Sequence, residues 1–320
     1  MRGLWGKLTR DATDPDEAIH YILNEQGCLD SMLQASTAGA RGKLTRLMSF
    51  PPLSRTASRI LDVVGNPDVD VDQMAEIINQ DPALTARILG LANSAYFGQI
   101  RAIATVREAI IRVLGLNMVK SLAISISMAG VFNPRLCKAF ILEDYWYRAL
   151  GGAMLARLIA QRISPEVQSD TESVYLCGLL HNLGELLLAH VFPDEFSKAL
   201  EAVEEAPASN PYEMEREYVG IDQVQAGELL MRRWHLPDGV IEVIGSLELM
   251  DYQGRYRVDL EVVRSARSWI SGDTHEAPPA LMENRRLISI PGLDRRALSL
   301  IQEQFLDQRE ALRDLARVLA

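Results

Sequence analysis

The apolar run from Val174 to Leu188 constrains the fold of this chain more than any other stretch. It is aliphatic almost throughout and long enough for about four helical turns. A helix that is apolar on every side is normally buried, so we expect this run to be a core helix. His181 and Asn182, followed by Gly184, interrupt it. A histidine beside a side-chain amide is out of place in a plain core, and this stretch is therefore the candidate functional site.

The rest of the chain also has helical periodicity, divided by proline, glycine and capping residues. Asp81-Pro82 combines an N-cap with proline at the first helical position, and Thr105 with Glu108 fits a capping box. Few segments alternate with period two, so we predict an all-α multi-helix bundle. Gly272 to Leu293 is predicted to be irregular. The predicted helices after residue 45 are 54–64, 71–79, 83–93, 105–114, 116–131, 138–163, 174–188, 195–205, 213–218, 224–234, 239–250, 258–270 and 298–319.

Composition and charge narrow the class of protein. The chain has 320 residues, a length of one large or two modest domains, and a formal net charge of −10 that disfavours nucleic acid. Only the basic stretch of Arg41, Lys43 and Arg46 favours nucleic-acid binding, so we expect that this chain does not bind nucleic acid. Three dispersed cysteines indicate a reducing compartment. We see no signal peptide in Met1 to Arg10 and no apolar run long enough to span a membrane, so a cytoplasmic location is expected.

A His-Asp pair at positions 181 and 182 would suggest a metal site, because imidazole and carboxylate both bind divalent ions. This chain has Asn182 there, an uncharged and weaker ligand. Glu185, four residues after His181, could face the same side as a ligand or as a hydrogen-bonded core contact. His190, His235 and His275 have no ligand-like spacing. Residues alone favour a buried, hydrogen-bonded His181 over a metal ligand.

Several motifs occur in a fixed order along residues 45 to 270. They are Phe50-Pro51-Pro52-Leu53, Ile77-Ile78, Asp81-Pro82-Ala83-Leu84-Thr85, Leu91-Ala92-Asn93-Ser94-Ala95-Tyr96-Phe97-Gly98, Ala109-Ile110, Leu114-Gly115, Tyr145-Trp146, Gly178-Leu179-Leu180-His181-Asn182-Leu183-Gly184, Gly220-Ile221, Gly227, Leu230, Trp234, Leu236 and Pro237. With these motifs the chain resembles the HDOD domain family, a divergent branch of the HD-domain phosphohydrolase superfamily. The Asp-Pro-Ala-Leu-Thr and Asn-Ser-Ala blocks are the most specific to that family.

The resemblance implies an all-helical bundle of two lobes, found in bacterial signalling proteins beside cyclic-dinucleotide or response-regulator domains. We place the HDOD domain at 45–270, with an N-terminal helical lobe at 45–133 and an HD-like lobe at 134–270. Residues 1–44 are predicted to be a helical extension, which begins after Asp14, and a linker. Residues 271–320 would form an irregular segment and an amphipathic helix.

The resemblance also allows the metal ligands of HD enzymes to be checked residue by residue. Arg148 falls near the upstream histidine, Asn182 replaces the aspartate, and Gln223 stands at a downstream position that is often histidine. Only His181 remains, so we expect no catalytic residue, no metal and no cofactor. The predicted function is a non-catalytic signalling module that contacts other signalling proteins. The rival is a metal-dependent phosphohydrolase acting on a nucleotide or cyclic dinucleotide. The remaining family-motif residues that we single out are Asp81, Pro82, Asn93, Ser94, Gly184, Trp234 and Pro237.

Two features of the sequence are each open to two interpretations. Asn93 and Tyr96 at a helix end are either capping and packing residues or a recognition surface. The C-terminal helix has heptad spacing, with Gln308 as the one polar core position. Its apolar face either packs on the chain's own core or pairs with a second copy in a homodimer. The apolar heptad positions are Leu298, Ile301, Phe305, Leu312, Leu315 and Leu319.

Overall fold

The computed structural model describes residues 46, 51–64, 68–99, 101–167, 169–207, 209–273 and 281–320. Within these residues every regular element is helical and none is a strand, which confirms the all-α prediction. The predicted extension at 1–44, Phe50 and His275 lie outside the part that the structure describes.

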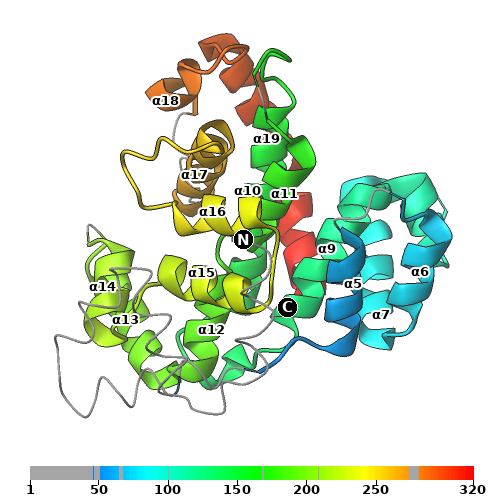
Figure 1. The fold of residues 1–320 in the computed structure, drawn as a ribbon, viewed down its shortest axis with the longest axis horizontal. Coiled ribbons are helices and arrows are strands. Elements are labelled where there is room, and N and C mark those ends of the chain that lie inside the picture. Colours follow the sequence, from blue (N-terminus) through cyan, green and yellow to red (C-terminus); the bar gives the residue numbers. More distant parts are fainter. Residues whose placement is uncertain are drawn as a thin grey trace, which may run out of the picture. The chain divides into compact units, whose positions relative to one another are not determined.

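The N-terminal lobe consists of α5 (Arg55–Val64), α6 (Val71–Asn79), α7 (Pro82–Ala92), α8 (Val106–Ala109) and α9 (Leu116–Ala129). Helices α6 and α7 begin directly after residues whose side chains cap the helix N-terminus. Asp70 and Gln73 form a capping box at α6, and the Asp81 carboxylate accepts the Leu84 N–H at 3.0 Å. Helix α9 packs against α5, α6 and α7, so it forms the centre of this lobe (Figure 1).

The helix predicted at 105–114 differs from expectation in two ways. Thr105 caps the Glu108 N–H as predicted, at 3.1 Å, but the Glu108 carboxylate accepts from Ala104 N at 3.0 Å, not from Thr105. The last turn, Ile110–Leu114, has π-helical hydrogen bonds and ends at Gly115, whose φ of 78° suits glycine.

The second lobe is built around α10 (Leu142–Ala160), which packs against α11 (Thr171–Leu180), α17 (Arg257–Ser271) and α19 (Arg295–Leu319). Figure 1 shows α10 and α19 side by side, in green and red. The other helices form two further packed pairs, in which α12 contacts α15 and α13 contacts α14. These four are α12 (Leu183–Val191), α13 (Pro193–Glu205), α14 (Pro211–Tyr218) and α15 (Gln223–Arg233), and α16 (Asp238–Gly245) follows.

The central apolar run is two helices, not the one that periodicity predicts. Helix α11 ends at Leu180, Asn182 has non-helical angles (φ −110°, ψ 14°), and α12 starts at Leu183. In a continuous helix the Gly178 carbonyl would accept the Asn182 N–H. Here the His181 Nδ1 lies 2.7 Å from that carbonyl, so the imidazole competes for it.

Burial along this run agrees with a core position. Leu180 and Leu183 are fully buried on either side of His181, which is 3% exposed. The stretch Thr171–Val191 does have the length and mean hydropathy of a membrane span, contrary to the expectation, but 89% of the tested window is buried inside the fold. A core helix of this kind meets the same criterion.

The C-terminal part adds η4 (Leu281–Glu283), α18 (Arg285–Ile288) and α19. The region predicted to be irregular therefore contains two short helical turns. Helix α19 packs against α10, α7, η4 and η1 (Ala95–Phe97), so it contacts both lobes. Its six apolar heptad positions are at most 3% exposed, and packing within the chain accounts for them. The homodimer stays a prediction.

Candidate functional site

The structure brings the four residues of the suspected degenerate site into one buried region. Arg148 comes from α10, His181 and Asn182 from the turn between α11 and α12, and Gln223 from the first position of α15. Gly184 makes this assembly possible. A Cβ on Gly184 would lie 1.9 Å from the Gln223 carbonyl oxygen, so only glycine lets the two backbones approach so closely.

His181 is a neutral, structurally bound imidazole. Burial lowers its pKa to about 3, the hydrogen bond with the Gly178 carbonyl opposes this, and Arg267 and Arg148 lower it further. A Cβ on Gly152 would lie 3.1 Å from the imidazole Cε1, so the ring also fills space against α10. The prediction of a buried, hydrogen-bonded histidine describes this geometry.

Asn182 uses its amide group to tie the turn to α10. Its Nδ2 donates to the Tyr145 carbonyl at 3.1 Å, while its Oδ1 is buried without a hydrogen-bond partner among the residues described. The Tyr145 hydroxyl is likewise buried and unbonded there, and burial raises its pKa. An aspartate at position 182 would lose the donated hydrogen bond and place a charge in this enclosed region.

Arg148 on α10 pairs with Glu185 on α12. The Glu185 side chain is 8% exposed and that of Arg148 is 29% exposed. Burial raises the pKa of Glu185 and Arg148 opposes that rise. Glu185 is therefore used for an ion pair, in which the Arg148 guanidinium donates to the only carboxylate of α12.

Gln223 is paired with a second buried carboxyl, Glu215 on α14, which sequence reasoning missed. The two Glu215 oxygens accept from the Gln223 N and Nε2, each at 2.7 Å. Glu215 is 3% exposed, and burial raises its pKa to about 8. The sequence signal for Glu215 was absent, because α14 is polar on most of its surface.

Arg267 on α17 is the other charged residue that the sequence did not indicate. It is 9% exposed, pairs with Glu248, and lies 4.9 Å from the centre of the Tyr212 ring. Its Nη1 is buried without a hydrogen-bond partner in the residues described. Arg267 sits among apolar positions of an amphipathic helix, and that misplacement was the signal that could have identified it.

These groups do not fit a catalytic metal centre. In the described ranges no group of three or more histidine, cysteine or acidic side chains is placed to hold an ion. Glu185 is neutralised by Arg148, and Asn182 presents its amide nitrogen to a carbonyl. A catalytic metal needs several protein ligands and an open position, and a guanidinium beside them opposes cation binding.

The family-motif residues lie outside this cluster except for Gly184. Pro82 occupies the first turn of α7 after the Asp81 cap, and Ser94 Oγ donates to the Leu91 carbonyl at 2.7 Å. Trp234 is 5% exposed and packs 5.8 Å from the Phe132 ring, and Pro237 precedes α16. Asn93 binds backbone at both ends of a loop, and Tyr96 faces α10 and α19. Their contacts are structural.

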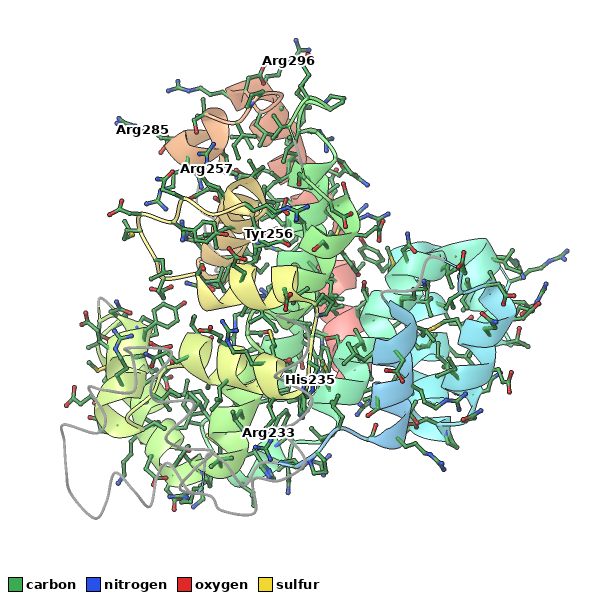
Figure 2. The ribbon with its side chains drawn as sticks, in the orientation of Figure 1. Arg233, His235, Tyr256, Arg257, Arg285 and Arg296 are labelled. Atoms are coloured by element: carbon green, nitrogen blue, oxygen red, sulfur yellow. The ribbon has the colours of Figure 1, made fainter. Side chains whose placement is uncertain are left out.

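The remaining histidines and basic residues are dispersed. His190 Nδ1 accepts the Asn133 N–H at 3.1 Å, and exposed His235 follows α15 with φ 56° (Figure 2). Exposed arginines occur near the starts of α17, α18 and α19, and Figure 2 labels Arg257, Arg285 and Arg296. Arg46 is exposed, whereas Arg41 and Lys43 lie outside the residues described.

Comparison with known proteins identifies similar chains. Residues 50–248 match the family model described as the HDOD domain. An uncharacterised protein of Treponema pallidum (strain Nichols) is 29% identical over 199 residues, which are 62% of this chain and 37% of that protein. This chain therefore spans little more than a third of that relative. The predicted domain boundaries of 45 and 270 stay a prediction.

Solved structures agree with the observed fold. A protein of Marinobacter aquaeolei VT8, named "Putative signal transduction protein", has a TM-score of 0.73 and 26% identity over 87% of this chain and 65% of its own. An HDOD domain protein with unknown function from Geobacter sulfurreducens has a TM-score of 0.69 and 22% identity, and the match covers 86% of this chain and 98% of that protein. A "Putative phosphohydrolase" from Shewanella amazonensis SB2B has a TM-score of 0.68 and 24% identity, and the match covers 87% of this chain and 98% of that protein. The last two show the fold alone.

Proposed function

This chain belongs to the HDOD domain family, and from that premise we propose that it is a non-catalytic signal-transduction module. The observation that carries the proposal is the ion pair of Arg148 and Glu185 beside His181. By the family resemblance, a cation would stand near the position where the parent superfamily binds its metal, and this cation engages the Glu185 carboxylate. Breaking a buried pair costs about 3–5 kcal/mol, and less where one partner is partly exposed as Arg148 is, so metal binding by Glu185 would have to overcome the remaining loss.

The module would act by contacts with other signalling proteins in a bacterial regulatory pathway, of the cyclic-dinucleotide or two-component kind that the family implies. The degenerate site would then hold α10, α12 and α15 in one arrangement through Asn182 and Gly184. The name of the similar Marinobacter protein, which refers to signal transduction, supports the same general role.

The rival function is metal-dependent hydrolysis of a phosphate ester. Its support is the name of the similar Shewanella protein, whose likeness concerns the fold. For this chain to act so, Arg148 would have to release Glu185 and the neutral Asn182 would have to serve as a ligand. No contact around His181 favours that rearrangement.

Metal content and hydrolysis decide between the two functions. We expect protein purified without chelator to hold less than a tenth of an equivalent of iron, manganese or zinc by elemental analysis. It should not hydrolyse bis-(p-nitrophenyl) phosphate or cyclic dinucleotides with added Mn²⁺. Asn182→Asp alone should stay inactive, because Arg148 and Gln223 are unchanged. Stoichiometric metal, with turnover that His181→Ala abolishes and Leu300→Ala, at an exposed position of α19, does not, would overturn the proposal.

A further inference from the structure

A cavity of about 60 Å³ lies at the junction of the two lobes, away from the His181 cluster. It is partly open to solvent and is lined by residues of α7, η1 and α9 of the N-terminal lobe and of α10, α11 and α19 of the rest. Most of the lining is aliphatic or thioether. The apolar residues that matter below are Leu122, Leu150, Met118, Met154, Leu312 and Leu315.

Arg157 of α10 is the single charged residue in this lining. In the part of the chain that the structure describes, it forms no ion pair with a carboxylate, and its Nε is buried without a hydrogen-bond partner. Its closest recorded interaction is with the Tyr175 ring, whose centre lies 5.8 Å from the guanidinium carbon. Arg157 is half-buried, and a cation that lines an apolar cavity without a counter-ion among the described residues favours a bound anion.

Two tyrosines line the same cavity, and one of them supplies a hydrogen-bond donor. Tyr175 is 6% exposed, and its hydroxyl has no hydrogen-bond partner among the residues described. The Tyr96 hydroxyl is already engaged, because it lies 2.8 Å from the Met154 sulfur and donates to Gln308 Oε1 at 3.1 Å. Burial raises the pKa of Tyr96 to about 12 and the Arg157 charge opposes this, so the Tyr96 phenol stays neutral.

The chemistry of the lining selects one kind of anion. No acidic side chain lines the cavity, and one guanidinium with the Tyr175 phenol can satisfy the two oxygens of a carboxylate. A phosphate would bring two more oxygens against leucine and methionine walls that cannot bind them. Water would fit, since about four molecules occupy such a volume, but water leaves the charge of Arg157 uncompensated.

We propose that this cavity binds a small aliphatic carboxylate of about two to four carbons. Its oxygens would bind Arg157 and the hydroxyl of Tyr175, and its alkyl group would contact Leu122 and Leu315. Because the lining comes from both lobes and from α19, such a ligand would hold these three parts together. This site goes beyond the proposed signalling role, and its occupancy is measured without a partner or a hydrolase assay.

Calorimetric titration of the full chain with propionate at constant ionic strength tests the site. We expect saturable one-to-one binding and a raised melting temperature. Propionamide, propylammonium and inorganic phosphate should do neither. Tyr175→Phe, which keeps the ring, should weaken binding about tenfold, because a hydrogen bond to a charged group is lost. Arg157→Gln should abolish it.

Arg162→Gln is the matched control, because Arg162 follows the same helix but bonds to the Leu158 carbonyl and to Gln304. Its affinity for propionate should equal that of the wild type. Leu315→Phe, which fills the cavity with an apolar ring, should block binding while the chain stays folded by circular dichroism. Unsaturable heats for acetate, propionate and butyrate overturn the site. Equal affinity in Arg157→Gln, or equal binding of phosphate or propionamide, overturns the carboxylate assignment.

Discussion

At the scale of single residues, side-chain amides and carboxyls that bind backbone hold the loops of this chain in place. Asn93 is the strongest case, because its Nδ2 donates to the Leu89 and Ile103 carbonyls, each at 2.9 Å, and its Oδ1 accepts from Ile103 N at 2.7 Å. These contacts favour the capping interpretation of Asn93 over a recognition surface.

We therefore predict that Asn93→Ala lowers the free energy of unfolding by about 1–3 kcal/mol, since three hydrogen bonds to backbone are lost. Urea denaturation measures it. Asn79→Ala, at an exposed position at the end of α6, is the control and should change stability by less than about 0.5 kcal/mol. Unchanged stability of Asn93→Ala with weaker binding of a partner would restore the recognition interpretation.

Glu215 gives the folded chain a defined response to pH. Its pKa rises from 4.5 to about 8 because of burial, so the folded state binds a proton that the unfolded state releases. Its contribution to stability is present below pH 4.5 and is lost as pH rises through about 8. His181 acts oppositely, because its pKa falls from 6.5 to about 3, and its contribution is lost as pH falls below 6.5.

Of these two groups, only Glu215 changes the free energy of unfolding between pH 6.5 and 8. We predict that the free energy of unfolding falls with pH in this window and that Glu215→Gln flattens the slope. Urea denaturation at four pH values across the window measures it. Glu217→Gln, an exposed residue of the same helix, should keep the wild-type slope. Parallel slopes for wild type and Glu215→Gln would contradict the prediction.

At the scale of elements, the close approach of α12 and α15 depends on one missing side chain. Gly184 lies against the Gln223 carbonyl and the Gly227 N, where an added Cβ would be 1.9 and 2.7 Å away. Both obstacles are backbone atoms and cannot rotate aside. The contact also fixes Gln223 and, through it, Glu215 of α14.

We predict that Gly184→Ala lowers stability by about 1–3 kcal/mol or more, because the helices must separate. Thermal and urea denaturation measure the loss. Gly227→Ala on the facing helix is a close control, since its Cβ would meet Gly184 N at an ordinary 3.5 Å. Alanine is the better helix former by about 1 kcal/mol, so Gly227→Ala should be neutral or stabilising. Equal stability of both variants would refute the argument.

At the scale of the whole molecule, α19 joins parts that are far apart in the sequence. Arg317 pairs with Glu143 at 3.0 Å, Arg309 pairs with Asp273 at 3.2 Å, and Gln308 meets Tyr96 of the N-terminal lobe. Phe305 packs edge-on against Trp269, with ring centres 5.0 Å apart. The apolar face of this helix is therefore part of the chain's own core.

We predict that Phe305→Asp lowers the melting temperature strongly, because it removes a core ring worth about 3–5 kcal/mol and buries a charge. The mass in light scattering should stay that of the wild type. Leu300→Asp, at a position that is 49% exposed on the same helix, should leave both values unchanged. A fall in mass with the melting temperature retained would instead indicate the homodimer seam.

The sequence by itself determined the helical class, most helix starts and the buried face of α19. These follow from signals within three or four residues, such as the Asp81 and Thr105 caps and the heptad spacing. It also pointed to Arg148, His181, Asn182 and Gln223, through their positions relative to a known motif.

Only the tertiary structure decided what these residues do. Arg148 and Glu185 are 37 positions apart, and Tyr96 and Gln308 are 212 apart, so no local pattern can pair them. The buried carboxyl of Glu215 and the cation of Arg157, which has no ion pair among the described residues, arise in the same way. Each depends on which helices pack together, and packing fixes both the partner of a polar group and its access to water.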